Sequence, residues 1–122
     1  MLPKKILNLL KNCLDFVIAY INDKAPKVKW EACRITGNVA QRFPDKVKEA
    51  IPKLLENTND KGTVVRWSPA FALANIAKNS KDVQKELVPE FNKILKREDN
   101  NGVRNSYLKF LKLNRRMKYE KD

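Results

Sequence analysis

Apolar residues recur along most of the chain at the three- and four-residue spacing that lines one face of a helix. A first helix is predicted from the apolar positions Val28, Ala32, Ile35, Val39, Ala40 and Phe43. After a break at residues 43–45, a second helix is predicted from the apolar positions Val47, Ala50, Ile51, Leu54 and Leu55. The same order of helix, break and helix returns after residue 61, so the pattern predicts successive helix pairs.

The helix pairs are also related in sequence. When Val28 is set against Val65, a shift of 37 residues, eight of the 29 positions from 28 to 56 are identical, where chance would give about two. A third copy opens at Val103, 38 residues after Val65. One helix pair cannot bury all of its apolar surface, so such units are expected to stack on one another.

The repeat divides the chain, which at 122 residues has the length of one domain. We expect a flanking helix (1–23), two units (24–60 and 61–98), a partial unit or cap helix (99–116) and a polar tail (117–122). Pro52, Pro69 and Pro89 fall inside helical patterns and predict a kink or a later helix start. Because Pro52 and Pro89 occupy equivalent positions, a bend shared by the two units is expected.

The unit openings resemble the first helix of HEAT repeats. They read Val28-Lys29-Trp30-Glu31-Ala32, Val65-Arg66-Trp67 and Val103-Arg104, and an acidic residue precedes each basic one by five or six positions. The resemblance covers about residues 24–114 and departs from the family in Lys29, where arginine is usual, and in a third unit without an evident second helix. It implies an all-α fold, a right-handed α-α superhelix of stacked antiparallel helix pairs. It also implies a ladder in which each aspartate pairs with the basic residue of a neighbouring repeat, here Asp23, Lys29, Asp60, Arg66, Asp99 and Arg104.

The N-terminal helix has more apolar surface than one neighbour covers. One stripe contains Ile6, Leu10, Cys13, Leu14, Val17 and Ile21, and another contains Leu9, Phe16 and Tyr20. A helix that begins an array is expected to have a polar outer face, but here only a narrow strip is polar. We expect either a plain cap, or self-association through this helix, or a longer array of which this chain is a piece.

The net charge of +12 is typical of a protein with an anionic partner, but its roughly even spread along the chain favours a merely solvated basic surface. In HEAT arrays the second helices line the concave surface, and the resemblance therefore places a basic binding face there, extended by the last helix. The binding candidates are Lys46, Lys53, Lys85, Lys93, Lys96, Arg97, Lys109, Lys112, Arg115 and Arg116. We expect a protein or peptide partner, with nucleic acid as the alternative and a merely solvated face as the third interpretation. Trp30 and Trp67 could stack on bases, but their equivalent positions favour helix packing.

Catalysis is not expected from this sequence. The absence of histidine excludes a histidine general base, a histidine triad and an imidazole metal ligand, and three glycines leave no glycine-rich phosphate loop. No catalytic residue, metal or cofactor is therefore predicted. One enzymatic alternative comes from the resemblance, because some DNA alkylation-repair glycosylases consist of HEAT-like repeats. Their catalytic positions have no match here.

The remaining features favour a cytoplasmic protein. Cys13 and Cys33 lack the spacing of a zinc or thioredoxin-type motif and are expected to be small buried residues. Lys11 and Asp15 interrupt the apolar N-terminal stretch, so neither a signal peptide nor a membrane span is predicted. The chain is expected to be a non-enzymatic binding scaffold.

Overall fold

The computed structural model describes the backbone of residues 3–121 and the side chains of residues 3–115. Over this range the chain is helical and contains no strand, which confirms the predicted all-α class. The elements are α1 (Lys4–Ala19), α2 (Pro26–Asn38), the 3₁₀ helix η1 (Val47–Ala50), α3 (Ile51–Asn57), α4 (Thr63–Asn79), α5 (Lys81–Arg97) and α6 (Asn101–Lys121).

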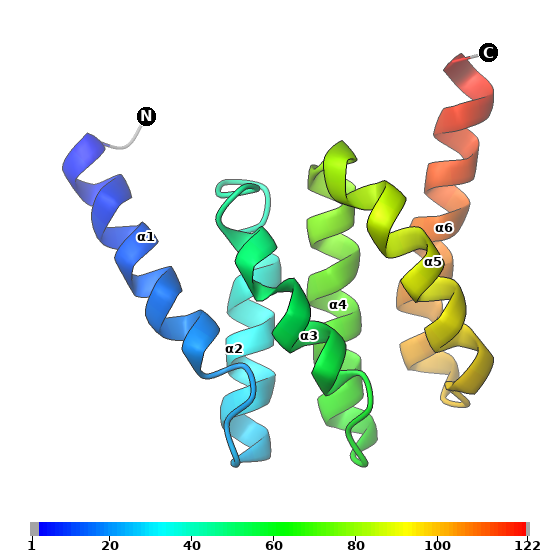
Figure 1. The fold of residues 1–122 in the computed structure, drawn as a ribbon, viewed down its shortest axis with the longest axis horizontal. Helices are drawn as coiled ribbons and strands as arrows, with labels where there is room; N and C mark the ends of the chain where they lie inside the picture. The colour runs from blue at the N-terminus through cyan, green and yellow to red at the C-terminus, as the bar shows by residue number, and fades with distance from the viewer. Residues whose placement is uncertain (1–2, 122) are drawn as a thin grey trace.

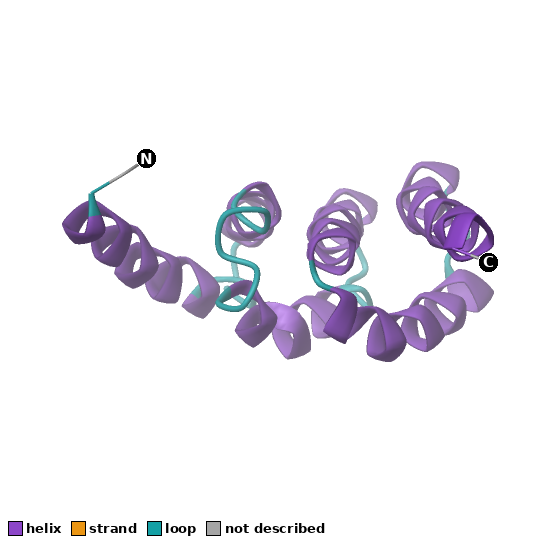
Figure 2. Ribbon diagram, turned by 90° about the horizontal axis from the view of Figure 1, so that it is seen from above, coloured by secondary structure: helices purple, strands orange, loops and turns teal. Residues whose placement is uncertain are grey.

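The helices form two rows (Figures 1 and 2). The even-numbered row contains α2, α4 and α6, and the odd-numbered row contains α1, α3 and α5. The most extensive contact in the molecule joins α4 to α2, and the next joins α4 to α6. The N-terminus and the C-terminus lie at opposite ends of the rows (Figure 1).

The core contains side chains from both rows. Its largest fully buried members are Tyr107, Phe91, Ile21, Leu54, Leu73, Ile76, Leu87 and Ile94. The Phe91 ring lies 4.9 Å from Tyr107 and 5.6 Å from Phe110, centroid to centroid. The aromatic side chains of Phe43, Phe91 and Tyr107 are buried, whereas Phe71 is only half-buried. Burial raises the pKa of the Tyr107 hydroxyl.

A glycine allows a close contact between α2 and α4 in the even-numbered row. A Cβ atom at Gly37 in α2 would lie 2.8 Å from Phe71 Cε2 and 3.0 Å from Ala72 Cα, both in α4. Atoms of folded proteins do not pack this closely. The backbone of α2 therefore reaches α4 only because residue 37 has no side chain.

The prolines do not produce the same geometry in the two units. Pro52 stands in the first turn of α3, where its missing N–H has no helical partner to lose, and the preceding residues 47–50 close as a 3₁₀ turn. Pro89 instead lies inside α5, which continues to Arg97, and Pro69 lies inside α4. The equivalent prolines therefore take different positions: the first unit starts its second α-helix late, at the proline, whereas the second unit starts its helix before it.

Two further expectations differ from the structure. The segment 117–121, predicted as a polar tail, continues α6, because no glycine or proline follows Gly102 to end the helix; Asp122 lies outside the described residues. Cys33 is buried as predicted, but Cys13 is exposed. Cys13 lies on a face of α1 that no described helix covers.

Candidate binding surfaces

A carboxylate organises the turn before each even-row helix. Asp23 accepts a hydrogen bond from the Ala25 amide at 3.0 Å, before α2. Asp60 accepts one from the Gly62 amide at 2.9 Å, before α4. Glu98 Oε2 accepts one from the Asn100 amide at 3.1 Å, before α6. Each acid bonds the amide two residues further on, so the three turns have the same local geometry.

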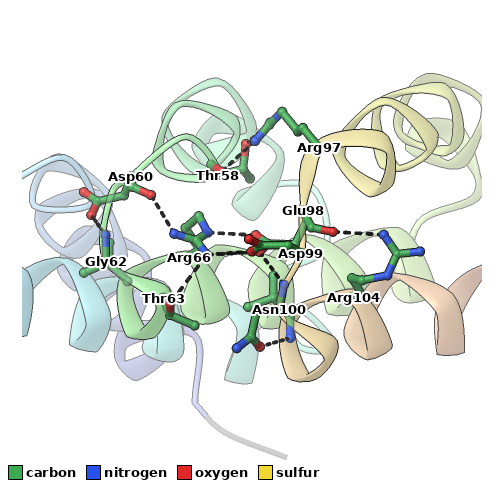
Figure 3. A network of polar contacts seen from close by, with 12 residues as sticks. Thr58, Asp60, Gly62, Thr63, Arg66, Arg97, Glu98, Asp99, Asn100 and Arg104 are labelled. Carbon is green, nitrogen blue, oxygen red and sulfur yellow. Dashed lines mark hydrogen bonds and ion pairs between the residues drawn. The ribbon is translucent and has the colours of Figure 1, made fainter.

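Two of these acids also bind the basic residue of the preceding even-row helix. Lys29 Nζ lies 2.9 Å from Asp60 Oδ2. Arg66 donates to both oxygens of Glu98, at 2.8 and 3.0 Å (Figure 3). The Glu98 side chain is only 2% exposed. The two ion pairs therefore connect α2 to the turn before α4, and α4 to the turn before α6.

The predicted ladder residues take unequal parts in this network. Asp99 lies 3.9 Å from Arg66 at its nearest oxygen, and the main contact belongs to Glu98 instead. The reason is register: the 38-residue shift that relates Val65 to Val103 sets Asp60 against Glu98. Arg104 donates to the backbone carbonyls of Leu95 and Glu98, and forms no ion pair with a described residue. Asp23 bonds the turn before α2 and forms no ion pair with a described residue.

The environment favours the ionised form of both ladder acids. The Gly62 amide and then Lys29 lower the pKa of Asp60. Burial opposes ionisation of Glu98, but the Arg66 guanidinium and the Asn100 amide together outweigh it, so the pKa of Glu98 is also lowered. These contacts hold neighbouring helices together. The charged groups of both ion pairs are therefore already paired within the chain.

Several predicted binding residues are likewise engaged within the chain. Arg97 donates to the Thr58 carbonyl and hydroxyl, both at 2.9 Å (Figure 3). Lys46 forms ion pairs with Asp15 and Glu49. These two hydrogen-bonded carboxylates raise the pKa of Lys46.

The other candidates are divided between the two rows. Lys93 lies 3.5 Å from Glu90, and Lys53, Lys85 and Lys96 form no ion pair with any described residue. These four belong to α3 and α5, whereas Lys109, Lys112 and Arg115 belong to α6. The side chain of Arg116 lies outside the described residues. The candidates whose side chains are described are therefore distributed over both rows of helices.

A groove of about 410 Å³ lies between α4 and α6. Its lining contains Trp67, Phe71, Ala74, Asn75, Lys78, Gly102, Asn105, Ser106, Lys109, Phe110 and Leu113. Trp67 is 38% exposed and stacks on Phe71, with ring centroids 5.7 Å apart and an interplanar angle of 11°. Its equivalent Trp30 is half-buried, and the Arg34 guanidinium carbon lies 5.6 Å from its ring centroid.

The α4–α6 groove has cations but no acid in its lining. Lys78 and Lys109 are exposed on its rim, and neither forms an ion pair with a described residue. No aspartate or glutamate occurs between residues 61 and 81 or between residues 100 and 119. Our sequence prediction missed Lys78 and favoured a packing role for Trp67; these two acid-free runs were the signal available. The groove combines an apolar, aromatic floor with a cationic rim.

A second groove, of about 460 Å³, lies between α1 and α2. Its lining contains Phe16, Val17, Tyr20, Lys27, Val28, Glu31, Ala32 and Ile35. Phe16 is 66% exposed beside it, although aromatic side chains gain most from burial. This end of the molecule therefore presents an apolar surface with one charge of each sign at its edge.

Among the described side chains, those of residues 3–115, no group of three or more histidine, cysteine, aspartate or glutamate residues is arranged to hold a metal ion. No helix within residues 3–121 has both the length and the apolar character needed to cross a membrane. Comparison with known proteins found no matching family model, curated protein or solved structure.

Proposed function

We propose that this chain is a non-enzymatic, HEAT-like helical-repeat scaffold that binds a segment of another protein in the α4–α6 groove. The observation that supports the proposal is an exposed aromatic floor between two helices, in a groove whose lining contains no acidic residue. Concave apolar sites with a few placed polar groups are the usual form of a binding site. A helical-repeat scaffold would position such a groove on a rigid surface.

The chemistry of the groove indicates which segment it would accept. Trp67, Phe71 and Leu113 offer contact to one apolar side chain. Lys78 and Lys109 on the rim would attract carboxylates on either side of that anchor. Asn75 and Asn105 can donate to, and accept from, the backbone of an extended segment. The partner is therefore an acidic segment with an apolar anchor residue.

The HEAT resemblance placed the binding face on the second helices, which here are α3 and α5. Between these two helices lies a hollow of about 370 Å³ whose lining includes Glu56 and Glu90. Arg97 in that lining is already bonded to Thr58. The mixed charge of this hollow would repel an acidic segment at some positions, so we favour the α4–α6 groove.

A nucleic-acid strand is the second candidate. The exposed Trp67 ring offers a stacking surface for a base, and Lys109, Lys112 and Arg115 follow one another along α6. Binding to phosphates would fall steeply as salt is added, because counterions are released. A protein segment held by an apolar anchor would be less sensitive to salt.

Selection from a library of random displayed peptides tests the first candidate. The triple variant Trp67→Ala, Lys78→Gln and Lys109→Gln serves for counter-selection. We expect peptides with an apolar residue flanked by aspartate or glutamate, which bind the unmodified chain at least about tenfold more tightly than the triple variant, a loss of about 1.4 kcal/mol. Lys85→Gln with Lys93→Gln is the matched control on α5 and should leave the affinity unchanged.

Other results would point elsewhere. Equal binding to the triple variant would contradict the proposed groove, and a loss confined to the α5 control would move the site to the odd-numbered row. Binding of single-stranded oligonucleotides, followed over a salt series, tests the second candidate. Nucleic acid would be favoured if the chain bound oligonucleotides more tightly than the selected peptides, and if the triple variant lost this binding.

A further inference from the structure

The outward face of α1 is apolar along its whole length. Leu9 is 59% exposed and Phe16 66%, and Ile6, Leu10 and Tyr20 are between 39% and 44% exposed. Cys13 and the half-buried Val17 complete the stripe. Single exposed apolar side chains are ordinary, but a contiguous patch of this kind marks an interaction surface.

Equivalent positions in the next unit show what is missing. Leu10 is 39% exposed, whereas Val47, 37 residues further on, is fully buried. Tyr20 is 40% exposed, whereas its equivalent Asn57 is 4% exposed and lies against Cys33 of α2. In that unit α2 contributes to covering the equivalent face, since it contacts the 3₁₀ helix that carries Val47 and supplies Cys33 against Asn57. A helix is therefore the kind of element that fits on the open face of α1.

We propose that this helix is α1 of a second copy of the chain, packed antiparallel about a twofold axis at Cys13. The apolar positions 6, 9, 10, 13, 16, 17 and 20 of this stripe have the same spacing when read in either direction from 13. A twofold axis there sets Ile6 opposite Tyr20, Leu9 opposite Val17 and Leu10 opposite Phe16. The stripe is thus complementary to itself, as an isologous dimer requires, and its three- and four-residue steps are those of a helix–helix seam.

Charge also permits two copies to meet at this end. Residues 1–23 contain three lysines and two aspartates, a net charge of +1 out of +12 for the whole chain. Two copies repel each other least when their most weakly charged ends approach. The groove beside Phe16 has room for an aliphatic side chain, and the twofold axis would bring Leu10 of the second copy there.

The other end of the molecule does not fit this stripe. The 38-residue shift sets Ala74 and Ala77 of α4 against Lys112 and Arg115 of α6. Both cations are exposed, and a head-to-tail contact would bury them against apolar side chains at a high cost in desolvation. These two cations of α6 therefore oppose a head-to-tail filament, and the favoured contact is between the two α1 helices. This surface is separate from the α4–α6 groove.

Light scattering after size-exclusion chromatography, in reducing buffer, tests the dimer. We expect a mass of twice 14.2 kDa for the unmodified chain at its highest soluble concentration. Leu9→Gln with Phe16→Gln should return the mass to 14.2 kDa with unchanged helical circular dichroism, because both side chains are exposed. Val64→Gln is the matched control: Val64 is 68% exposed on α4 and the change should leave the dimer intact.

Cys13 gives an independent test of the twofold axis. Mild oxidation with diamide should join two Cys13 thiols in one disulfide, while diamide accepts the two electrons and two protons and becomes the hydrazine. Cys13→Ser should abolish the crosslink, since Cys33 is buried. Cys13→Ser combined with Asn8→Cys places the thiol on the polar side of α1 and should not restore it.

Three results would overturn the proposal. A monomer at all concentrations would show that a second copy does not cover α1. A dimer that persists in the Leu9→Gln, Phe16→Gln variant would show that another surface forms it. Crosslinking through Asn8→Cys at the rate of Cys13 would show that the thiols meet by random collision.

Discussion

Single carboxylates hold the turns that precede the even-row helices. Asp23, Asp60 and Glu98 each accept the amide two residues further on, which satisfies a donor that the helix itself leaves without a partner. Glu98 adds two bonds from Arg66 and is almost fully enclosed. A charge so enclosed depends on its partner, because leaving it unpaired costs the full penalty of desolvation.

We expect Arg66→Met to lower the free energy of unfolding by about 2 kcal/mol at neutral pH, because the Glu98 carboxylate loses its guanidinium. Urea denaturation followed by circular dichroism measures the change. Lys96→Met removes a cation of α5 that has no ion pair with a described residue, and should alter stability by less than about 0.5 kcal/mol. Equal losses in the two variants would contradict the role of this pair.

The pH dependence of this difference has a definite sign. The pKa of Glu98 is lowered in the folded chain, so its contribution is fully present above the ordinary glutamate value of 4.5. As the pH falls below that value, the unfolded chain binds the proton first, and the contribution is lost as the pH falls through the folded-state pKa. The difference in free energy of unfolding between the unmodified chain and Arg66→Met should therefore become smaller as the pH falls through this range.

Helix packing depends on small residues where the even-row helices meet. Gly37 in α2 lies against Phe71 and Ala72 in α4, and Ala72 is itself fully buried. Helices that approach this closely gain contact along their length but leave no space for an added methyl group. The contact between α2 and α4 is the most extensive in the molecule. The distance between these two helices therefore sets their positions relative to each other.

Gly37→Ala is expected to destabilise the fold by about 1–3 kcal/mol, because the new methyl group overlaps Phe71 and the backbone of α4. Helix propensity alone would give the opposite sign, by about 1 kcal/mol in favour of alanine. Urea denaturation again measures the effect. Asn38→Ala, at the neighbouring exposed position, is the control and should change stability by less than about 0.5 kcal/mol. A more stable Gly37→Ala variant would show that the two helices can separate freely.

The charge of the whole molecule opposes its compact state. A net charge of +12 creates repulsion between cations throughout the chain. The ion pairs present include several on exposed side chains, such as Lys93–Glu90 and Arg34–Glu31, and exposed pairs contribute little to stability. Screening should therefore relieve more repulsion than attraction.

We expect the thermal unfolding midpoint to rise when NaCl is increased from about 0.01 M to about 0.15 M, because the Debye length falls from about 30 Å to about 8 Å. Melting curves by circular dichroism at one protein concentration measure it. A neutral solute at the same osmolality is the control and should give a smaller rise. A midpoint that falls with salt would show that the ion pairs outweigh the repulsion.

The periodicity of apolar residues was enough to predict the all-α class, the helix pairs and the breaks between them, because helical spacing is a local property. The 37-residue shift likewise indicated which positions are equivalent. It could not indicate that Trp67 lines a groove while Arg34 lies over Trp30. Equivalent residues differ when different neighbours cover them.

The sequence by itself determined the helices and the basic balance of this chain, since both follow from residue types and their spacing. Only the tertiary structure decided that Arg66 forms its main ion pair with Glu98 and not with Asp99. It also decided that the predicted basic residues divide between two rows and that Cys13 is exposed. The physical reason is the same in each case: burial and ion pairing depend on which helix lies opposite, and residues far apart in the chain supply that helix.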